Sequence, residues 1–253
     1  MPVRNDPRVV TPPRTTAPDS TRVATPANTG TTTPASTRGR TRNRDTFETP
    51  RSSTTPTSYK PPGNIAKSVR KLIDANPNLT TFVGGHKTIE ECTGYGVHGK
   101  AYTLDASAAK FMDTLKTIKP SELWNDTARY EMAFDRTTGK VYTKGNEQPA
   151  IREGMVFFLE LDIALGVKIP VSFEIMKMDA ATGEFTFSYT TNNKSQGIQR
   201  LMIEDTPTGS KVFHETRFKS DSNFRDKHFY KPFHEKLLNE FYGALNKRMA
   251  AGG

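Results

Sequence analysis

One five-residue pattern, Asp-x-x-Thr-Gly, occurs three times in the second half of the chain, as Asp135-Arg-Thr-Thr-Gly139, Asp179-Ala-Ala-Thr-Gly183 and Asp205-Thr-Pro-Thr-Gly209. Each copy lies between segments rich in β-branched and aromatic residues. The aspartate can accept a hydrogen bond from the backbone two residues further on, and the glycine can adopt the positive φ that closes a short hairpin. Three such turns predict an antiparallel, up-and-down sheet.

The segments around these turns alternate apolar and polar residues with a period of two. For example, Leu159 and Leu161 alternate with Glu160 and Asp162 before a turn at residues 165–166. This alternation predicts a sheet with one apolar face and one solvated face, made of about six or seven strands. The expected strands are 95–104, 129–134, 139–144, 154–164, 167–178, 184–191, 196–205 and 210–219.

A first helix is predicted from Asn64, which can cap it, with an apolar face formed by Ile65, Val69, Leu72 and Ile73. After the strand at 95–104, two short helices are expected. Either Asp105 or Ser107 can cap the first of them, and Pro120 begins the second, which carries Trp124.

The C-terminal segment predicts one long helix that ends near Met249 and covers the apolar face of the sheet. Pro232 either opens this helix or kinks it. The apolar residues that recur at every fourth position are Phe229, Phe233, Leu237, Phe241 and Leu245.

The first 62 residues differ in composition from the rest of the chain. They hold 11 of the 17 prolines and 16 threonines, with few large aliphatic side chains, and we expect them to form a disordered arm. Nine arginines and one lysine against four acids give the arm a charge of +6, whereas the remainder carries 26 basic and 23 acidic residues, or +3. Weak contact of the arm with anionic surfaces is therefore expected, but not a nucleic-acid-binding domain.

Cys92 is the only cysteine, which excludes an internal disulfide and a cysteine-based metal cluster. No run of about 18 apolar residues indicates a transmembrane helix. The N-terminus lacks the apolar core of a secretory signal, so a cytoplasmic location is expected. The arm looks like the leaders of some predatory, myxobacterial-type bacterial proteins, which leaves export without a classical signal open.

The order of the elements resembles the helix-grip fold of the START-like superfamily (SRPBCC, the polyketide-cyclase and Bet v 1-type proteins). Thr103-Leu-Asp-Ala-Ser-Ala-Ala-Lys-Phe-Met-Asp113 is similar to its first strand running into its first helix. Gly209-Ser-Lys-Val-Phe-His-Glu-Thr-Arg-Phe218 is similar to its late strand, and Phe241-Tyr-Gly-Ala-Leu245 to the end of its last helix.

The resemblance implies an α+β fold in which a curved antiparallel sheet wraps around the C-terminal helix and leaves a cavity between them. It covers about residues 95–250, after the arm at 1–62 and an additional short helix and linker at 63–94. Members of the superfamily bind sterols, phospholipids, polyketides and aromatic metabolites, and some are enzymes. The candidate wall residues are Phe157, Leu159, Leu161, Val171, Phe173, Phe185, Phe187, Tyr189, Phe229, Phe233 and Phe241.

The same side chains could instead meet and fill the core, because aromatic residues at such spacing are more often core than cavity wall. His214 could point into the cavity as an acid or base, or lie on the solvated face. Glu160 and Asp162 share the polar face and are expected to be solvated. His228 and His234 lie six apart, which is poor spacing for metal ligands on a helix.

The sequence therefore predicts no catalytic residue, no metal and no cofactor. The expected function is binding or carriage of a hydrophobic small molecule or lipid, with His214 among the residues that contact it. Two alternatives stay open. One is an enzyme acting on a hydrophobic substrate in the same cavity, and the other is an interaction module that uses the basic arm.

Overall fold

The computed structural model describes residues 58–164, 166–222 and 230–252, and we discuss only these. The arm at residues 1–57, together with His228 and Phe229, lies outside the described residues. Residues 58–62, which the composition assigned to the arm, are described. Among them, the Tyr59 N–H donates to the Pro77 carbonyl oxygen at 2.7 Å, and its ring packs against the domain.

All three Asp-x-x-Thr-Gly segments form hairpin turns, as predicted. They join β2 (Ala128–Asp135) to β3 (Val141–Thr143), β5 (Val167–Asp179) to β6 (Glu184–Tyr189), and β7 (Ser195–Thr206) to β8 (Gly209–Ser220). Asp135 accepts from the N–H of Thr137, and Asp179 accepts from that of Ala181, each at 2.9 Å. Asp205 departs from the pattern, because its carboxylate accepts instead from the N–H of Ala108, the first residue of a helix.

The sheet has eight antiparallel strands in the order β1-β8-β7-β6-β5-β4-β2-β3. The remaining strands are β1 (Gly96–Leu104) and β4 (Met155–Ala164). All eight segments predicted as strands lie in this one sheet, so the expected number of six or seven was too low. The edge strand β1 pairs with β8 along its whole length, and the three residues of β3 pair with β2. The helix-grip arrangement of one curved sheet around a C-terminal helix is confirmed.

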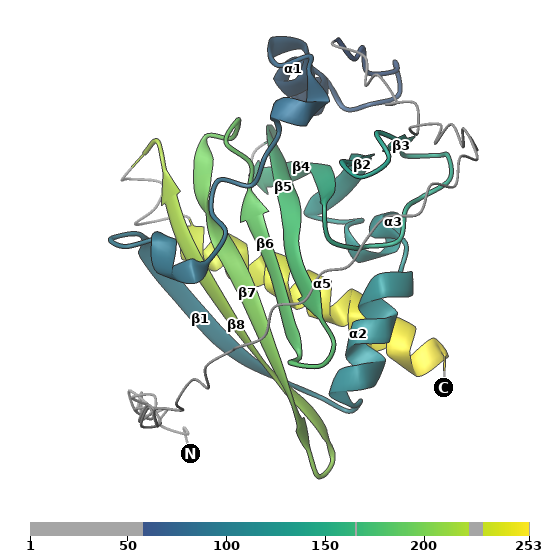
Figure 1. Ribbon diagram of the computed structural model, residues 1–253, viewed down its shortest axis with the longest axis vertical. Coiled ribbons are helices and arrows are strands. Elements are labelled where there is room, and N and C mark those ends of the chain that lie inside the picture. The colour runs from purple at the N-terminus through teal and green to yellow at the C-terminus, as the bar shows by residue number, and fades with distance from the viewer. Residues whose placement is uncertain (1–57, 165, 223–229, 253) are drawn as a thin grey trace, which may run out of the picture. The chain divides into compact units, whose positions relative to one another are not determined.

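Helix α5 (Lys231–Ala251) lies against one face of the sheet, which we call the inner face (Figure 1). Pro232 stands in its first turn and opens it. The predicted apolar stripe was right at Phe241 and Leu245, which are buried, but Phe233 and Leu237 are only half-buried. The inward-facing residues are His234, Leu238, Phe241, Tyr242, Leu245 and Met249.

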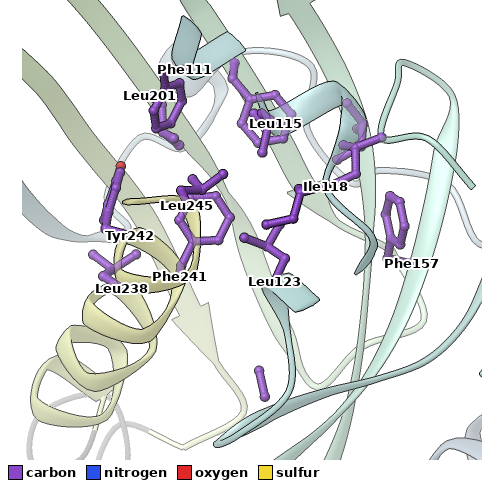
Figure 2. Packing of buried hydrophobic residues seen from close by; sticks show 14 of the residues in the cluster. Phe111, Leu115, Ile118, Leu123, Phe157, Leu201, Leu238, Phe241, Tyr242 and Leu245 are labelled. Carbon is purple, nitrogen blue, oxygen red and sulfur yellow. The ribbon is translucent and has the colours of Figure 1, made fainter. Parts of the chain in front are cut away.

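Two short helices fill the space beside α5. In α2 (Ala108–Thr117), the Ser107 hydroxyl accepts from the Lys110 N–H and caps the helix, and Pro120 begins α3 (Pro120–Leu123). Figure 2 shows side chains from α2, from the segment after it and from the sheet gathered around Phe241 and Leu245 of α5. This half of the space between the sheet and α5 is solid core.

The sequence predicted that the opposite, outer face of the sheet is solvated, but part of this face is covered. Helix α1 (Lys67–Ala75) and the chain around it cover β2, β4 and part of β5, and two short 3₁₀ turns follow at Leu79–Thr81 and Ile89–Glu91. The side chains of this second apolar cluster are Ile65, Val69, Ile73, Leu79, Phe82, Met132, Phe134, Val156 and Phe158. The additional N-terminal segment therefore supplies a cover for the outer face.

Buried carboxylates help to hold α1 in place. Glu131 accepts from the Ala66 N–H at 2.7 Å, so that a sheet residue, and not Asn64 as predicted, satisfies the start of α1. The Asn64 side chain donates to the Lys144 carbonyl oxygen. Contrary to the expectation of a solvated carboxylate, Glu160 is buried, and burial opposes its ionisation. Hydrogen bonds from Ser68 and Lys168 outweigh burial and lower the pKa of Glu160.

The second of the three turns offers a test of how β6 pairs with β7. Gly183 has φ of 63°, and a Cβ atom added there would lie 2.2 Å from the Ile203 carbonyl oxygen of β7. Gly145 has φ of 88° with no atom within 4 Å of such a Cβ. Gly145→Ala should cost about 1 to 2 kcal/mol from backbone strain alone. Gly183→Ala should cost about 2 kcal/mol more, because β7 must move. Equal losses in urea denaturation would contradict this pairing.

Candidate functional site

A cavity of about 80 Å³ lies between the inner face of the sheet and α5. At about 30 Å³ per molecule, it has room for about three water molecules. Pockets for larger ligands measure about 300–1,000 Å³. The wall is mainly apolar, and it is made by β4, β5 and β6, by residues 123–128 and by α5. A few polar side chains gather at the β7–β8 side.

The structure brings most of the predicted wall residues to this cavity. Phe157 and Phe185 are instead packed in the core, and Phe233 of α5 is not part of the wall. Phe229 lies outside the described residues. The predicted residues that line the cavity are Leu159, Leu161, Val171, Phe173, Phe187, Tyr189, His214 and Phe241.

Several lining residues were missed by the sequence analysis. Trp124, the only tryptophan of the chain, packs against Phe173 with ring centroids 5.4 Å apart. Gln199 of β7 gave no signal, because a single polar residue in a strand does not reveal which face it occupies. His234 and Leu238 lie one position beyond Phe233 and Leu237, which the predicted stripe had placed inward.

The cavity has a polar rim beside α3. Asn125, Asp126 and Glu240 line both the cavity and a shallow surface groove next to it. The Glu240 carboxylate accepts from the N–H of Thr127 at 3.1 Å and from its hydroxyl at 2.5 Å. These two bonds tie α5 to the chain just before β2, so they narrow the cavity at this side.

The inner end of the cavity carries a hydrogen-bonded cluster centred on Gln199. Its Oε1 atom lies 2.8 Å from Nε2 of His214 and 3.1 Å from Nε2 of His234. Nδ1 of His214 lies 3.1 Å from the Tyr242 hydroxyl. Nδ1 of His234 lies 3.0 Å from Nδ1 of His98, which places three imidazoles from β1, β8 and α5 in one chain of contacts.

The orientation of His214, which the sequence left open, is therefore inward. It is 1% exposed and shares the inner face of β8 with Val212 and Thr216. The sequence analysis found nothing that would orient this ring, because its two partners, Gln199 and Tyr242, are distant in sequence. The pairing of His234 with His98 and Gln199 was missed for the same reason.

Burial keeps His214 and His234 uncharged at neutral pH. Desolvation, reinforced by His234 and His98, holds the pKa of His214 well below its usual value. Desolvation and the neighbouring His98 lower the pKa of His234 to about 3. Desolvation also raises the pKa of the Tyr242 hydroxyl. The cavity therefore offers neutral hydrogen-bonding groups within an apolar wall, which suits an uncharged ligand.

Within the described part of the chain, no group of three or more His, Cys, Asp or Glu side chains has the arrangement of a metal site. The thiol of Cys92 is buried away from the cavity, and desolvation raises its pKa to about 11, so it is a poor nucleophile. None of the helices in the described ranges is both long and apolar enough to span a bilayer.

One long helix held by a curved antiparallel sheet, with two short helices after the first strand, is the arrangement that the resemblance implied. The chain has the helix-grip fold. No known protein-family profile matches the sequence, and no curated protein sequence is significantly similar to it.

Solved structures with a similar arrangement include the KanY protein, with 14% identity, 62% of this chain and 99% of that chain covered, and a TM-score of 0.46. A protein from Thermus thermophilus has 11% identity, coverage of 62% and 99%, and a TM-score of 0.45. The major latex-like protein 151 from Panax ginseng has 11% identity, coverage of 61% and 97%, and a TM-score of 0.43. These similarities concern the fold alone.

The buried neutral histidine predicts how stability depends on pH. Because the pKa of His234 falls from 6.5 to about 3 on folding, the unfolded chain binds the extra proton between these values. The stability that the neutral His234 side chain contributes is thus complete above about pH 6.5 and is lost as the pH falls toward 3. The free energy of unfolding of His234→Gln should fall less steeply in this range, by up to about 1.4 kcal/mol per pH unit. Urea denaturation at several pH values measures both slopes, and parallel slopes would contradict a neutral His234.

Proposed function

We propose that the domain binds a small, uncharged aromatic molecule in the cavity between the sheet and α5. The observation that carries this proposal is the wall itself, in which aromatic and aliphatic side chains surround a space that ends in neutral polar groups. Apolar surface removed from water supplies most of the affinity in such a site, and a few polar groups fix the orientation of the ligand.

The volume favours a single-ring compound over a lipid or sterol. About 80 Å³ is well below the space that a sterol or an acyl chain needs. The other half of the space between the sheet and α5 is filled by α2 side chains such as Phe111 and Leu115. An apolar cavity of about 150 Å³ holds benzene, so a single-ring compound is the largest ligand that suits this cavity, and it enters only as the lining side chains move apart. Trp124, Phe173 and Phe187 offer ring faces and edges to an aromatic ligand.

The arrangement of the histidines favours binding over catalysis. Both ring nitrogens of His214 have partners in the protein, Gln199 and Tyr242, and both nitrogens of His234 are also within bonding distance of protein groups. A general base needs a lone pair that faces the substrate. The alternative function of the basic arm rests on residues outside the described ones, and it stays a prediction from composition.

The single tryptophan makes the proposal testable in solution. The indole N–H of Trp124 gives one NMR signal, and acetophenone added to the full-length chain should shift it in a saturable manner. Palmitate should leave the signal unchanged, because an acyl chain exceeds the cavity. Saturable binding of palmitate with no response to acetophenone would instead support a lipid carrier.

Filling the cavity should abolish this response. Val171 lines the cavity, whereas Val167 is 55% exposed at the start of the same strand. Val171→Phe should weaken acetophenone binding by about tenfold or more, equivalent to about 1.4 kcal/mol, because the added ring occupies the space of the ligand. Val167→Phe serves as the matched control and should keep the wild-type affinity. Equal affinity of both variants in the same titration would place the binding site elsewhere.

A further inference from the structure

The polar end of the cavity is a continuous chain of hydrogen-bonding atoms that begins near the protein surface. The carboxylate of Glu235, which is 48% exposed, lies 3.3 Å from Nε2 of His98. From His98 the contacts pass through His234 to Gln199, as described above. The Gln199 amide nitrogen lies 3.3 Å from the hydroxyl of Tyr189, which lines the cavity.

The groups at the two ends of this hydrogen-bonded series, the Glu235 carboxylate and the Gln199 amide, determine which atom donates in each hydrogen bond. A carboxylate only accepts, so Nε2 of His98 must donate to Glu235. The Gln199 Oε1 atom also only accepts, so Nε2 of His234 must donate to it. A neutral imidazole has one donor and one acceptor nitrogen. If both rings were neutral, the Nδ1 atoms of His98 and His234, 3.0 Å apart, would then both be acceptors. One additional proton on the pair removes this conflict.

Turning over the Gln199 amide gives a second arrangement in which every bond is satisfied. Its NH₂ group then donates to Nε2 of both His214 and His234, so His234 donates from Nδ1 to a neutral His98. The amide oxygen now faces Tyr189 and accepts from its hydroxyl. The two arrangements use the same heavy-atom positions and differ by one proton on the His98–His234 pair.

We propose that Gln199 determines the hydrogen-bonding polarity of the cavity and couples it to one proton on the His98–His234 pair. With the proton present, the amide nitrogen donates to Tyr189, whose own hydroxyl proton is then directed at the cavity or at Tyr230, 3.4 Å away. The cavity then takes a ligand with a carbonyl oxygen. With the proton absent, Tyr189 donates to Gln199 and presents only lone pairs to the ligand.

Charged and titratable groups face the pair from several elements. The Glu235 carboxylate of α5 lies 3.3 Å from Nε2 of His98, and Lys100 of β1 lies 3.8 Å from the other Glu235 oxygen. Burial, together with the neighbouring His98, lowers the pKa of His234. Among the described residues, the other titratable groups near the cluster are Tyr102 of β1, Tyr189 of β6, His214 of β8, Tyr230 just before α5, and Tyr242 of α5.

The first test needs no ligand. In the arrangement with the additional proton, His214 carries its hydrogen on Nε2, and in the other arrangement it carries it on Nδ1. Imidazole ¹⁵N spectra of the full-length chain between about pH 5 and about pH 8.5 should show His214 changing tautomer while it stays neutral. A single His214 tautomer across this range overturns the proposal, whether or not the cavity binds a ligand.

The second test rests on the proposed function and uses two ligands with the same skeleton. Acetophenone can only accept a hydrogen bond, whereas 1-phenylethanol can donate or accept. The affinity for acetophenone should fall by up to about tenfold per pH unit above the midpoint of the tautomer change. The affinity for 1-phenylethanol should change less than about twofold, because its hydroxyl suits both arrangements.

Gln199→Met keeps the size of the side chain but cannot relay hydrogen bonds. It should make the ratio of the two affinities independent of pH, whereas Gln196→Met, at an exposed position of the same strand, should keep the wild-type dependence. Binding of both ligands to the wild type at a pH-independent ratio would overturn the proposal and leave the proposed function intact. Failure of both ligands to bind at any pH would refute the proposed function, and the His214 spectra would then decide this proposal alone.

Discussion

The hydrogen bonds of Gln199 to His214 and His234 join strands β7 and β8 to helix α5 inside the protein. A buried polar group without a partner costs about 1–3 kcal/mol, so these three side chains must meet once the sheet closes on the helix. Their meeting sets the rotation of α5. It turns His234, Leu238 and Tyr242 inward and leaves Phe233 half-buried. With α5 in this rotation, its side chains and those of α2 fill only part of the space between the sheet and the helix, and the cavity is the part that stays open.

On the outer face of the sheet, too, the buried polar groups have hydrogen-bonding partners. The cover formed by α1 and the neighbouring chain buries apolar residues such as Phe158, and it also buries Glu131 and Glu160. These carboxylates are tolerated because backbone N–H groups, hydroxyls and lysines surround them. Both faces of β2 and β4 are thereby covered, the inner face by the core around α5 and the outer face by the segment that carries α1.

Local patterns predicted most of the fold. The Asp-x-x-Thr-Gly turns and the period-two alternation act within a few residues, so they were sufficient to place the strands and the hairpins. The site could be predicted only in part. Aromatic residues on the inner face were recognisable, but the partners of His214 come from other strands and from α5. In the first half of α5 the predicted stripe was one position off, at Phe233 and Leu237 instead of His234 and Leu238, because a phenylalanine suggests burial more strongly than a histidine, whose partners are invisible in the sequence.

The central claim is that a ligand lies between the sheet and α5, and the most direct measurement is of intermolecular nuclear Overhauser effects from bound acetophenone to protein methyl groups. The account predicts effects to Leu159, Val171 and Leu238, which line the cavity, and none to Val97 or Val167, which are 45% and 55% exposed on the surface. Effects at saturation that reach only the exposed valines, or that miss all three lining residues, would contradict it.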